Sequence, residues 1–444
     1  MARGGLFGID GFGTVTSGVA FSWRPRLSKD DVEVLKGVAM FLIVAHNFLH
    51  LIGPTPRENE FGFTGAEGVW TAIALCIREP GELLHVLLSF FGHYGVVVFV
   101  LLSGYGLAKK TGIPSRSSIS SMPHAAAALR RAVKVSRTQV VKTLRLLSLG
   151  IPAALAWKIG LLEEDAREVF SELAAFLTLT NNLRTWTVLD AGMDGAASMP
   201  VWGFVSVWWF FALIVQLYLI FPVLFPLFCW KLRKPREREL RGLAPSDAAL
   251  LILFAGLGAA GVFYGEAARS GLLLFATPLT HGVVFFLGIR MAFAEERPEL
   301  GIPVSLISLM GGVFLLAQFA EAFFPVSFLA FGVWFAHAYD GAKAGKGRLQ
   351  DFLRARPIRW FGRLSPYVFL VHGFMREPFA TMLDAWRAET ELGEVLTSLC
   401  VLAAFSIWFA GVVAAALSVR RLAGWLDGRR RSMSSPVLPL ALSR

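Results

Sequence analysis

Apolar segments of about 20 residues recur along this chain, and that is the length of a helix that crosses a bilayer. Strands of a membrane barrel would be about 10 residues long, with alternating polarity. The composition agrees, because 55% of the 444 residues are hydrophobic and 17% are charged. Soluble domains carry about 25% charged residues. The sequence therefore predicts an all-α integral membrane protein, a polytopic bundle of about ten transmembrane helices in a lipid bilayer.

The expected spans lie near residues 32–52, 86–107, 139–158, 202–230, 247–265, 271–293, 302–320, 323–341, 358–378 and 395–420. Pro222 and Pro226 fall in the fourth span and are expected to bend it or end it early. Between the third and fourth spans, Phe170 to Leu179 is too short to cross and predicts an interfacial or re-entrant helix. The Ser- and Ala-rich segment 111–128 predicts a loop.

Lysine and arginine gather in every second loop, as they do on the cytoplasmic side of membrane proteins. The 53–85 loop, by contrast, has two cations against five glutamates. This alternation predicts a cytoplasmic N-terminal segment (1–31), a transmembrane domain (32–420) and a basic cytoplasmic tail (421–444). The loops also account for the net charge of +11, so we expect no nucleic-acid partner.

The cysteines and the N-terminus carry little further signal. Cys76, Cys229 and Cys400 lie far apart and show no metal-binding or disulfide spacing, so no metal site is expected. Residues 1–31 are Gly-rich and lack the apolar core of a cleaved signal peptide. The first span is therefore expected to act as an uncleaved insertion signal.

The first span contains ionisable residues, which are costly inside a membrane and usually functional. Lys36 lies near its start, and His46 and His50 lie near its end. On a helix, Lys36 and His46 project about 80° apart and lie about 15 Å apart along the axis, whereas Asn47 and His50 lie within about 20° and 40° of the Lys36 face. The structural alternatives are a Lys36 that reaches the headgroups and a His46 that hydrogen-bonds a neighbouring helix.

Other spans carry polar residues that have two interpretations. Ser103 and Tyr105 belong to a Ser-Gly-Tyr-Gly stretch that suits either polar chemistry or close helix packing. Trp208 and Trp209 suit an outer aromatic belt. Gln216 suits a hydrogen bond between helices.

The ninth span repeats the pattern of the first. Arg363 comes first, and His372 follows two to three turns deeper. The third span has Lys142 and Arg145 near its cytoplasmic end, where cations also serve as simple markers of topology.

Four segments, in order, resemble the membrane acyltransferase-3 family: LKGVAMFLIVAHNF, FVLLSGYGL, WWFFALIVQLYLIFP and FGRLSPYVFLVHG. The resemblance extends from about residue 30 to residue 420. It implies an O-acyltransferase of surface glycans in a bacterial inner or plasma membrane. Such an enzyme moves an acyl group, often acetyl, from cytoplasmic acyl-CoA to a hydroxyl of a glycan or glycolipid, with acyl-CoA as a substrate and no permanently bound cofactor.

The resemblance also implies roles for single residues. The family's first-helix basic residue falls on Lys36 and its first-helix histidine on His46. The other matches are Ser103, Gly104, Tyr105, Arg145, Gly362, Ser365, Tyr367 and His372.

The chain departs from the family pattern at several positions. The family commonly has arginine at position 36 and places its histidine at position 47, where this chain has Asn47. A glutamate frequent in the Trp-rich span is Ile214 here, and Pro366 separates Ser365 from Tyr367. These differences leave open whether His46 or His50 is the catalytic base.

A neutral imidazole can accept the proton of a hydroxyl as it attacks a thioester, so His46 is the expected general base. Cations bind phosphates well, so Lys36, Arg145 and Arg363 are expected to hold the donor. The remaining assignments are His372, Ser103 and Tyr105 to the catalytic centre, and His50, Trp208, Trp209 and Gln216 to the acceptor side. Both direct transfer and an acyl-enzyme are compatible with these residues.

A proton-coupled transporter or flippase of a glycan or small metabolite is the competing class. Buried histidine and lysine residues would suit such a carrier. Many carriers show paired repeats with broken helices in matching positions, and this sequence shows no such repeat.

Overall fold

The computed structural model describes residues 22–23, 25–55, 64–113, 122–161, 163–180, 205–231, 277–296, 302–320, 323–345, 348–374, 376–390 and 392–434. These residues form helices, together with one antiparallel pair of two-residue strands, β1 (Ser22–Trp23) and β2 (Ile302–Pro303). The predicted all-α class is therefore confirmed.

The α-helices in chain order are α1 (Lys29–Leu49), α2 (Gly65–Arg78), α3 (Leu83–Phe91), α4 (Gly95–Thr111), α6 (Met122–Leu155), α7 (Ala166–Leu177), α8 (Trp209–Lys231), α11 (Pro278–Glu296), α12 (Val304–Ala317), α13 (Phe324–Ala344), α14 (Arg348–Arg354), α15 (Arg356–Val371), α16 (Arg376–Glu389) and α17 (Glu394–Ser434). Short 3₁₀ turns are η1 (Pro80–Glu82), η2 (Gly92–Tyr94) and η5 (Ser206–Trp208), and η3 (Ala156–Leu161) is a π-helical turn.

Five helical stretches of the described chain are long and apolar enough to cross a membrane: Lys29–Leu49, Pro80–Thr111, Ala126–Gly160, Trp209–Cys229 and Glu394–Asp427. They correspond to the first four and the last of the expected spans. The expected span 247–265 lies outside the described residues. The other four coincide with α11, α12, α13 and α15, which are shorter or less uniformly apolar. The expected number of about ten spans is not confirmed.

Several boundaries differ from the predictions. The α6 helix begins at Met122, so residues 122–128 are helical and not a loop. The α8 helix continues past Pro222 and Pro226, so neither proline ends it. The α17 helix runs beyond residue 420 to Ser434. The short helix expected between the third and fourth spans is present as α7.

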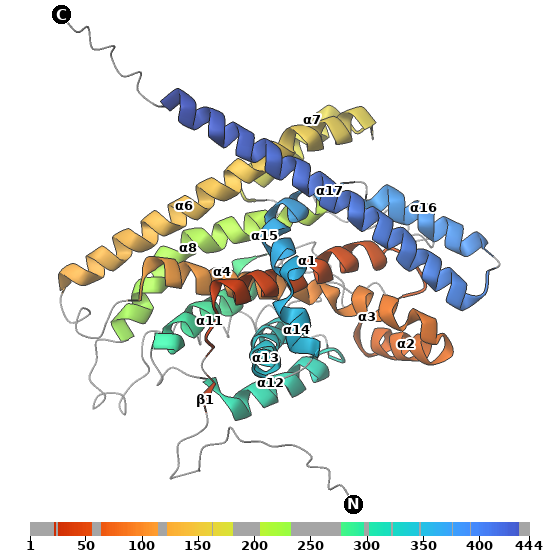
Figure 1. Ribbon diagram of the computed structural model, residues 1–444, viewed down its shortest axis with the longest axis horizontal. Coiled ribbons are helices and arrows are strands. Elements are labelled where there is room, and N and C mark those ends of the chain that lie inside the picture. Colours follow the sequence, from red (N-terminus) through yellow and green to blue (C-terminus); the bar gives the residue numbers. More distant parts are fainter. Residues whose placement is uncertain are drawn as a thin grey trace, which may run out of the picture.

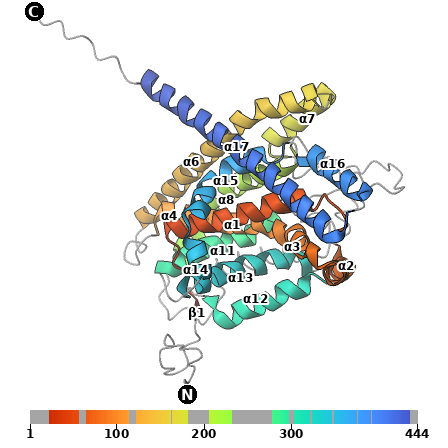
Figure 2. The same ribbon diagram turned by 45° about the vertical axis from the view of Figure 1, so that its right-hand side comes forward.

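The first helix lies in the middle of the bundle (Figures 1 and 2). The α12 helix lies at one edge, and α6 and α17 lie at the opposite edge and extend beyond the other helices. Most of the apolar part of α1 is enclosed, whereas the apolar parts of α6 and α17 are largely exposed. Polar side chains on α1 are therefore surrounded by protein, and α6 and α17 offer apolar faces to lipid.

The central helix is held firmly near its start. Ser28 caps its start, because the Ser28 side chain accepts from the Asp31 backbone and Asp31 accepts from the Ser28 backbone in turn. Near the same end, α15 crosses α1 at Gly37 and Gly362. A Cβ atom on Gly362 would collide with the carbonyl oxygen of Glu33, so the two backbones are in direct contact there.

We expect Gly362→Ala to destabilise the protein by about 1–3 kcal/mol, since the added methyl group must push α1 and α15 apart. The measurement is the thermal unfolding midpoint of the purified protein in detergent. Gly411→Ala is the matched control, because a Cβ atom at Gly411 on α17 meets no atom within 4 Å. Equal midpoints for the two variants would show that the crossing is not as tight as described.

Candidate active site

Three histidine rings meet at the centre of the bundle. His46 and His50 come from α1, and their rings stack at 4.5 Å with an interplanar angle of 6°. His93 comes from η2, and its ring centroid lies 5.2 Å from that of His46. All three side chains are buried. Helix spacing predicts the first two as neighbours but does not predict their contact with His93.

The break between α3 and α4 explains how His93 reaches this position. The 3₁₀ turn Gly92–Tyr94 interrupts the helix, and a Cβ atom on Gly92 would collide with the backbone of α1 at Leu42. Glycine therefore lets the turn pack directly on α1 beside His46.

Hydrogen bonds define which nitrogen of His46 carries a hydrogen. Its Nδ1 lies 2.6 Å from the carbonyl oxygen of Ser89, which can only accept. The hydrogen is therefore on Nδ1, and Nε2 of the neutral ring carries the lone pair. The same holds for His50, whose Nδ1 lies 2.7 Å from the carbonyl oxygen of His46. Both rings are held in the tautomer that a general base needs at Nε2.

His372 forms a second polar group beside α1. Its Nε2 lies 3.2 Å from Nδ2 of Asn47, and its Nδ1 lies 2.9 Å from the carbonyl oxygen of Phe369. Arg376 donates from Nη1 to Oδ1 of Asn47 at 3.2 Å. The charge of Arg376 acts on the rings of both His46 and His372, so the two groups are close neighbours.

The three cations expected at the donor site do not share a described contact. Arg363 is paired with Glu33 of α1 at 2.7 Å. Arg145 is exposed on α6. Lys36 is half-buried and interacts electrostatically with Lys110 and Glu33.

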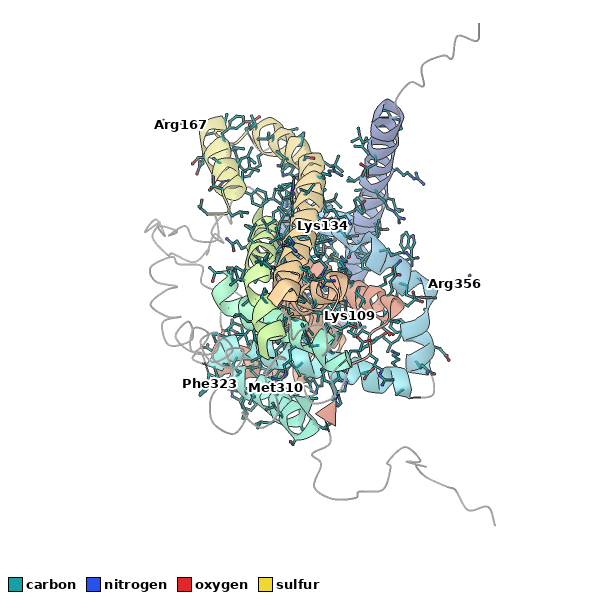
Figure 3. All side chains as sticks on the ribbon, turned by 90° about the vertical axis from the view of Figure 1, so that its left-hand side faces the viewer. Lys109, Lys134, Arg167, Met310, Phe323 and Arg356 are labelled. Atoms are coloured by element: carbon teal, nitrogen blue, oxygen red, sulfur yellow. The ribbon has the colours of Figure 1, made fainter. Side chains whose placement is uncertain are left out.

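Lys36 instead belongs to a row of lysines. The positive charge of Lys110, at the end of α4, repels that of Lys36 on α1. The charge of Lys142 on α6 in turn repels that of Lys110. Figure 3 looks onto this end of the bundle, where the labelled Lys109 and Lys134 mark the end of α4 and the first half of α6. From the sequence, Lys142 suits a simple marker of topology, and Lys110 is one of the cations of a cytoplasmic loop. Their approach to Lys36 depends on the antiparallel packing of the three helices.

Ser103 and Tyr105 lie away from the histidines. Gly95 packs on Ala39, so Ser103 lies about 12 Å further along α4, toward the Lys36 end. Ser103 interacts with the hydroxyl of Tyr218. The Tyr105 hydroxyl donates to Glu295 at 2.8 Å and contacts the carbonyl oxygen of Leu27 at 3.1 Å. These contacts tie α4 to its neighbours.

The residues expected on the acceptor side are separated. Trp208 is buried and donates to the carbonyl oxygen of Leu370 at 3.0 Å, close to His372. The Trp209 ring lies 6.0 Å from the ring of His281. Gln216 donates to the carbonyl oxygen of Leu179 at 2.9 Å, so it is an interhelical link between α8 and the end of α7.

A polar cavity of ≈ 420 Å³ lies at the start of α1. Its lining includes Asp31, Tyr339, Lys343 and Arg359. Lys343 pairs with Asp31 at 2.8 Å, and Arg359 pairs with Asp30. Its charges are therefore satisfied within the protein, and none of the three clustered histidines lines it.

Sequence reasoning missed Arg376 and gave no role to His281. Arg376 follows His372 by four residues, but α15 ends at Val371 and α16 begins at Arg376, so helix spacing does not link the two. His281 is buried beside Trp209 and Phe328. No pattern in the sequence links it to either ring.

The described residues form a helical bundle with five stretches that are long and apolar enough to cross a membrane, and three buried histidines meet at its centre, as expected of a polytopic membrane protein. A family model, described as an acyltransferase domain, matches residues 29–418. The chain belongs to this family, the acyltransferase-3 family, as the four sequence segments indicated. It is an acyltransferase that transfers groups other than amino-acyl groups. No curated protein and no solved structure matches the chain significantly.

Proposed function

We propose that this membrane acyltransferase moves an acetyl or similar acyl group from cytoplasmic acyl-CoA to a hydroxyl of a cell-surface or exported glycan. The observation that supports this most is the geometry of His46. Its ring is buried in the central helix, and the Ser89 carbonyl holds it with the lone pair on Nε2. A neutral imidazole in that form is suited to accept a proton from an attacking hydroxyl.

The reaction then runs as a direct transfer. The acceptor oxygen attacks the thioester carbonyl carbon, and His46 Nε2 takes the hydroxyl proton as the C–O bond forms. The tetrahedral intermediate reforms its C=O bond by breaking the C–S bond. His46 returns the proton to the sulfur, so CoA leaves as the thiol. An acyl-enzyme would need a nucleophile beside Nε2.

The test is acyl transfer by the purified protein in lipid. With labelled acetyl-CoA, we expect CoA release and transfer of label to a glycan fraction from the host membrane. Release and labelling should both be absent from protein inactivated by heat. If the protein binds no acyl-CoA and instead carries glycan across vesicle membranes, the transporter or flippase function would replace this proposal.

The donor is proposed to bind at the Lys36 end of the bundle. Lys36 lies close to Lys110, and Lys110 lies close to Lys142, so positive charge from α1, α4 and α6 gathers where CoA phosphates would enter. Arg145 adds an exposed cation to α6. Repulsion among neighbouring cations is relieved when an anion binds between them.

We expect Lys36→Ala to weaken CoA binding by about 1.5–3 kcal/mol, the value of a hydrogen bond to a charged group. Arg145→Ala is expected to act in the same direction. Arg363→Ala should have a smaller effect, because Glu33 already neutralises that guanidinium. Titration calorimetry with CoA measures all three. If Arg363→Ala abolishes binding while Lys36→Ala does not, the phosphates bind at α15.

Both termini are proposed to be cytoplasmic, since the cation-rich ends of α4 and α6 lie at one end of the bundle. Lys134 on α6 and Glu389 on α16 are both exposed and serve as labelling sites. With the three native cysteines replaced, we expect a membrane-impermeant thiol reagent to label Glu389→Cys in intact cells and to spare Lys134→Cys. The reverse pattern would invert the orientation.

A further inference from the structure

Asn47 is held from two sides by groups on other helices. Its amide oxygen accepts from Nη1 of Arg376 at 3.2 Å, and its amide nitrogen lies 3.2 Å from Nε2 of His372. Arg376 and His372 are both buried, and Asn47 is half-buried. Contacts between residues more than 300 positions apart in the sequence thus converge on one amide group.

Only one arrangement of hydrogens satisfies these contacts. A guanidinium can only donate, so the oxygen of Asn47 must face Arg376 and its nitrogen must face His372. Nε2 of His372 then accepts, and Nδ1 of His372 carries the hydrogen that it donates to the Phe369 carbonyl at 2.9 Å. Rotating the amide by half a turn would place its NH₂ group against the guanidinium of Arg376, and both of these groups are donors.

This arrangement uses one of the two hydrogens on the amide nitrogen of Asn47. The second amide hydrogen of Asn47 forms no hydrogen bond with another described residue. The amide group that carries it is already held in position by Arg376 and His372 before a substrate binds. Preorganised donors of this kind stabilise negative charge that develops in a transition state.

The position of Asn47 on α1 also suits this purpose. Asn47 lies within about 20° of the Lys36 face and about 16 Å along the axis from Lys36. A donor whose phosphates bind at the Lys36 end would extend along this face toward Asn47. His46, the preceding residue, projects about 100° around the helix from Asn47, and the charge of Arg376, which holds Asn47, reaches the His46 ring as well.

We propose that Asn47 is a catalytic residue that donates its second amide hydrogen to the thioester carbonyl oxygen, with Arg376 and His372 as its positioning residues. This inference rests on the proposed acyl transfer. When the acceptor oxygen attacks, the carbonyl π electrons move onto the carbonyl oxygen, and Asn47 stabilises that oxyanion. When the C–S bond breaks, the C=O bond reforms and the hydrogen bond weakens. His372 then has its lone pair occupied by Asn47 and does not compete with His46 as base.

Asn47→Asp is the decisive variant, because aspartate keeps the size of the side chain and the contact with Arg376 but has no hydrogen to donate, either to a substrate or to His372. We expect kcat to fall about 10²–10³-fold, as when one oxyanion donor is lost. The KM for acyl-CoA and the affinity for CoA should change little. A purely structural role would instead lower the unfolding midpoint and CoA affinity together.

Two variants of Arg376 provide a second measurement if Asn47→Asp fails to fold. Arg376→Met removes the donor that orients the amide, and we expect kcat to fall about tenfold. Arg376→Lys keeps a donor and a charge and should restore most of that loss. Wild-type kcat in Asn47→Asp, or in Arg376→Met, would overturn the inference while leaving the proposed function in place. A wild-type enzyme that transfers no acyl group would overturn the proposed function itself.

Discussion

A His46→Ala enzyme is expected to lose about 10²–10⁴-fold in the rate of acyl transfer, the usual cost of removing a general base. The loss should appear in kcat. CoA binding should remain, because the lysine row near Lys36 lies about 15 Å away along α1. The measurement is CoA release from acetyl-CoA at saturating donor, with protein amounts matched.

His50→Ala is the matched control, since it removes a stacked imidazole one helical turn away on the same helix. We expect a smaller effect, because His50 is held by the backbone carbonyl of His46 and lies nearer the end of α1. A His46→Ala enzyme with wild-type turnover, together with an inactive His50→Ala enzyme that still binds CoA, would assign the base to His50.

Much of the histidine cluster could be predicted, and the reason is local geometry. His46 and His50 are four residues apart, so helix periodicity alone makes them neighbours. His93 could not be predicted in this way, because its approach depends on a 3₁₀ turn packing on α1 through Gly92. The contact of Arg376 with Asn47 joins α16 to α1 across 329 positions, and single-sequence patterns carry no such pairing.

The proposed donor residues show what charge patterns in a sequence leave open. Lys36, Arg145 and Arg363 are predicted to lie at a similar depth in the membrane. That depth does not predict which charged residue each of them contacts. Arg363 forms an ion pair with Glu33, an acidic residue in the first turns of α1. Lys110 has a like-charged neighbour on each side and is the better candidate for meeting an anion.

The fold could be predicted where hydrophobicity decides it. Apolar runs identified the helices, because burial in lipid requires every backbone group to bond within a helix. The predicted helix ends are inaccurate where a helix extends beyond its apolar segment into polar sequence. The α6 and α17 helices continue through charged residues, since an exposed helix does not need an apolar face to persist there.

A buried ion cluster at the other end of α1 carries the largest expected effect on stability. The Glu82 side chain is fully buried and accepts from His85 at 2.8 Å, from Arg387 at 2.9 Å and from Ser398. Nε2 of His85 lies 3.0 Å from the Leu49 carbonyl. Both nitrogens of His85 therefore face oxygen atoms, one of the Glu82 carboxylate and one of the α1 backbone.

Among the described residues, Glu82 is the anion that contacts both His85 and Arg387, so removing it would leave the largely buried Arg387 guanidinium without this counter-charge. We therefore expect Glu82→Ala to lower the free energy of unfolding by about 3–5 kcal/mol, the cost of breaking a buried ion pair from one side. Thermal unfolding in detergent measures the loss. Glu394→Ala is the control, because that side chain is exposed at the start of α17. The double variant Glu82→Ala, Arg387→Ala should be more stable than Glu82→Ala alone, since one unpaired charge is removed. If the double variant is less stable, Arg387 stabilises α16 by packing and the cluster is not held together by charge.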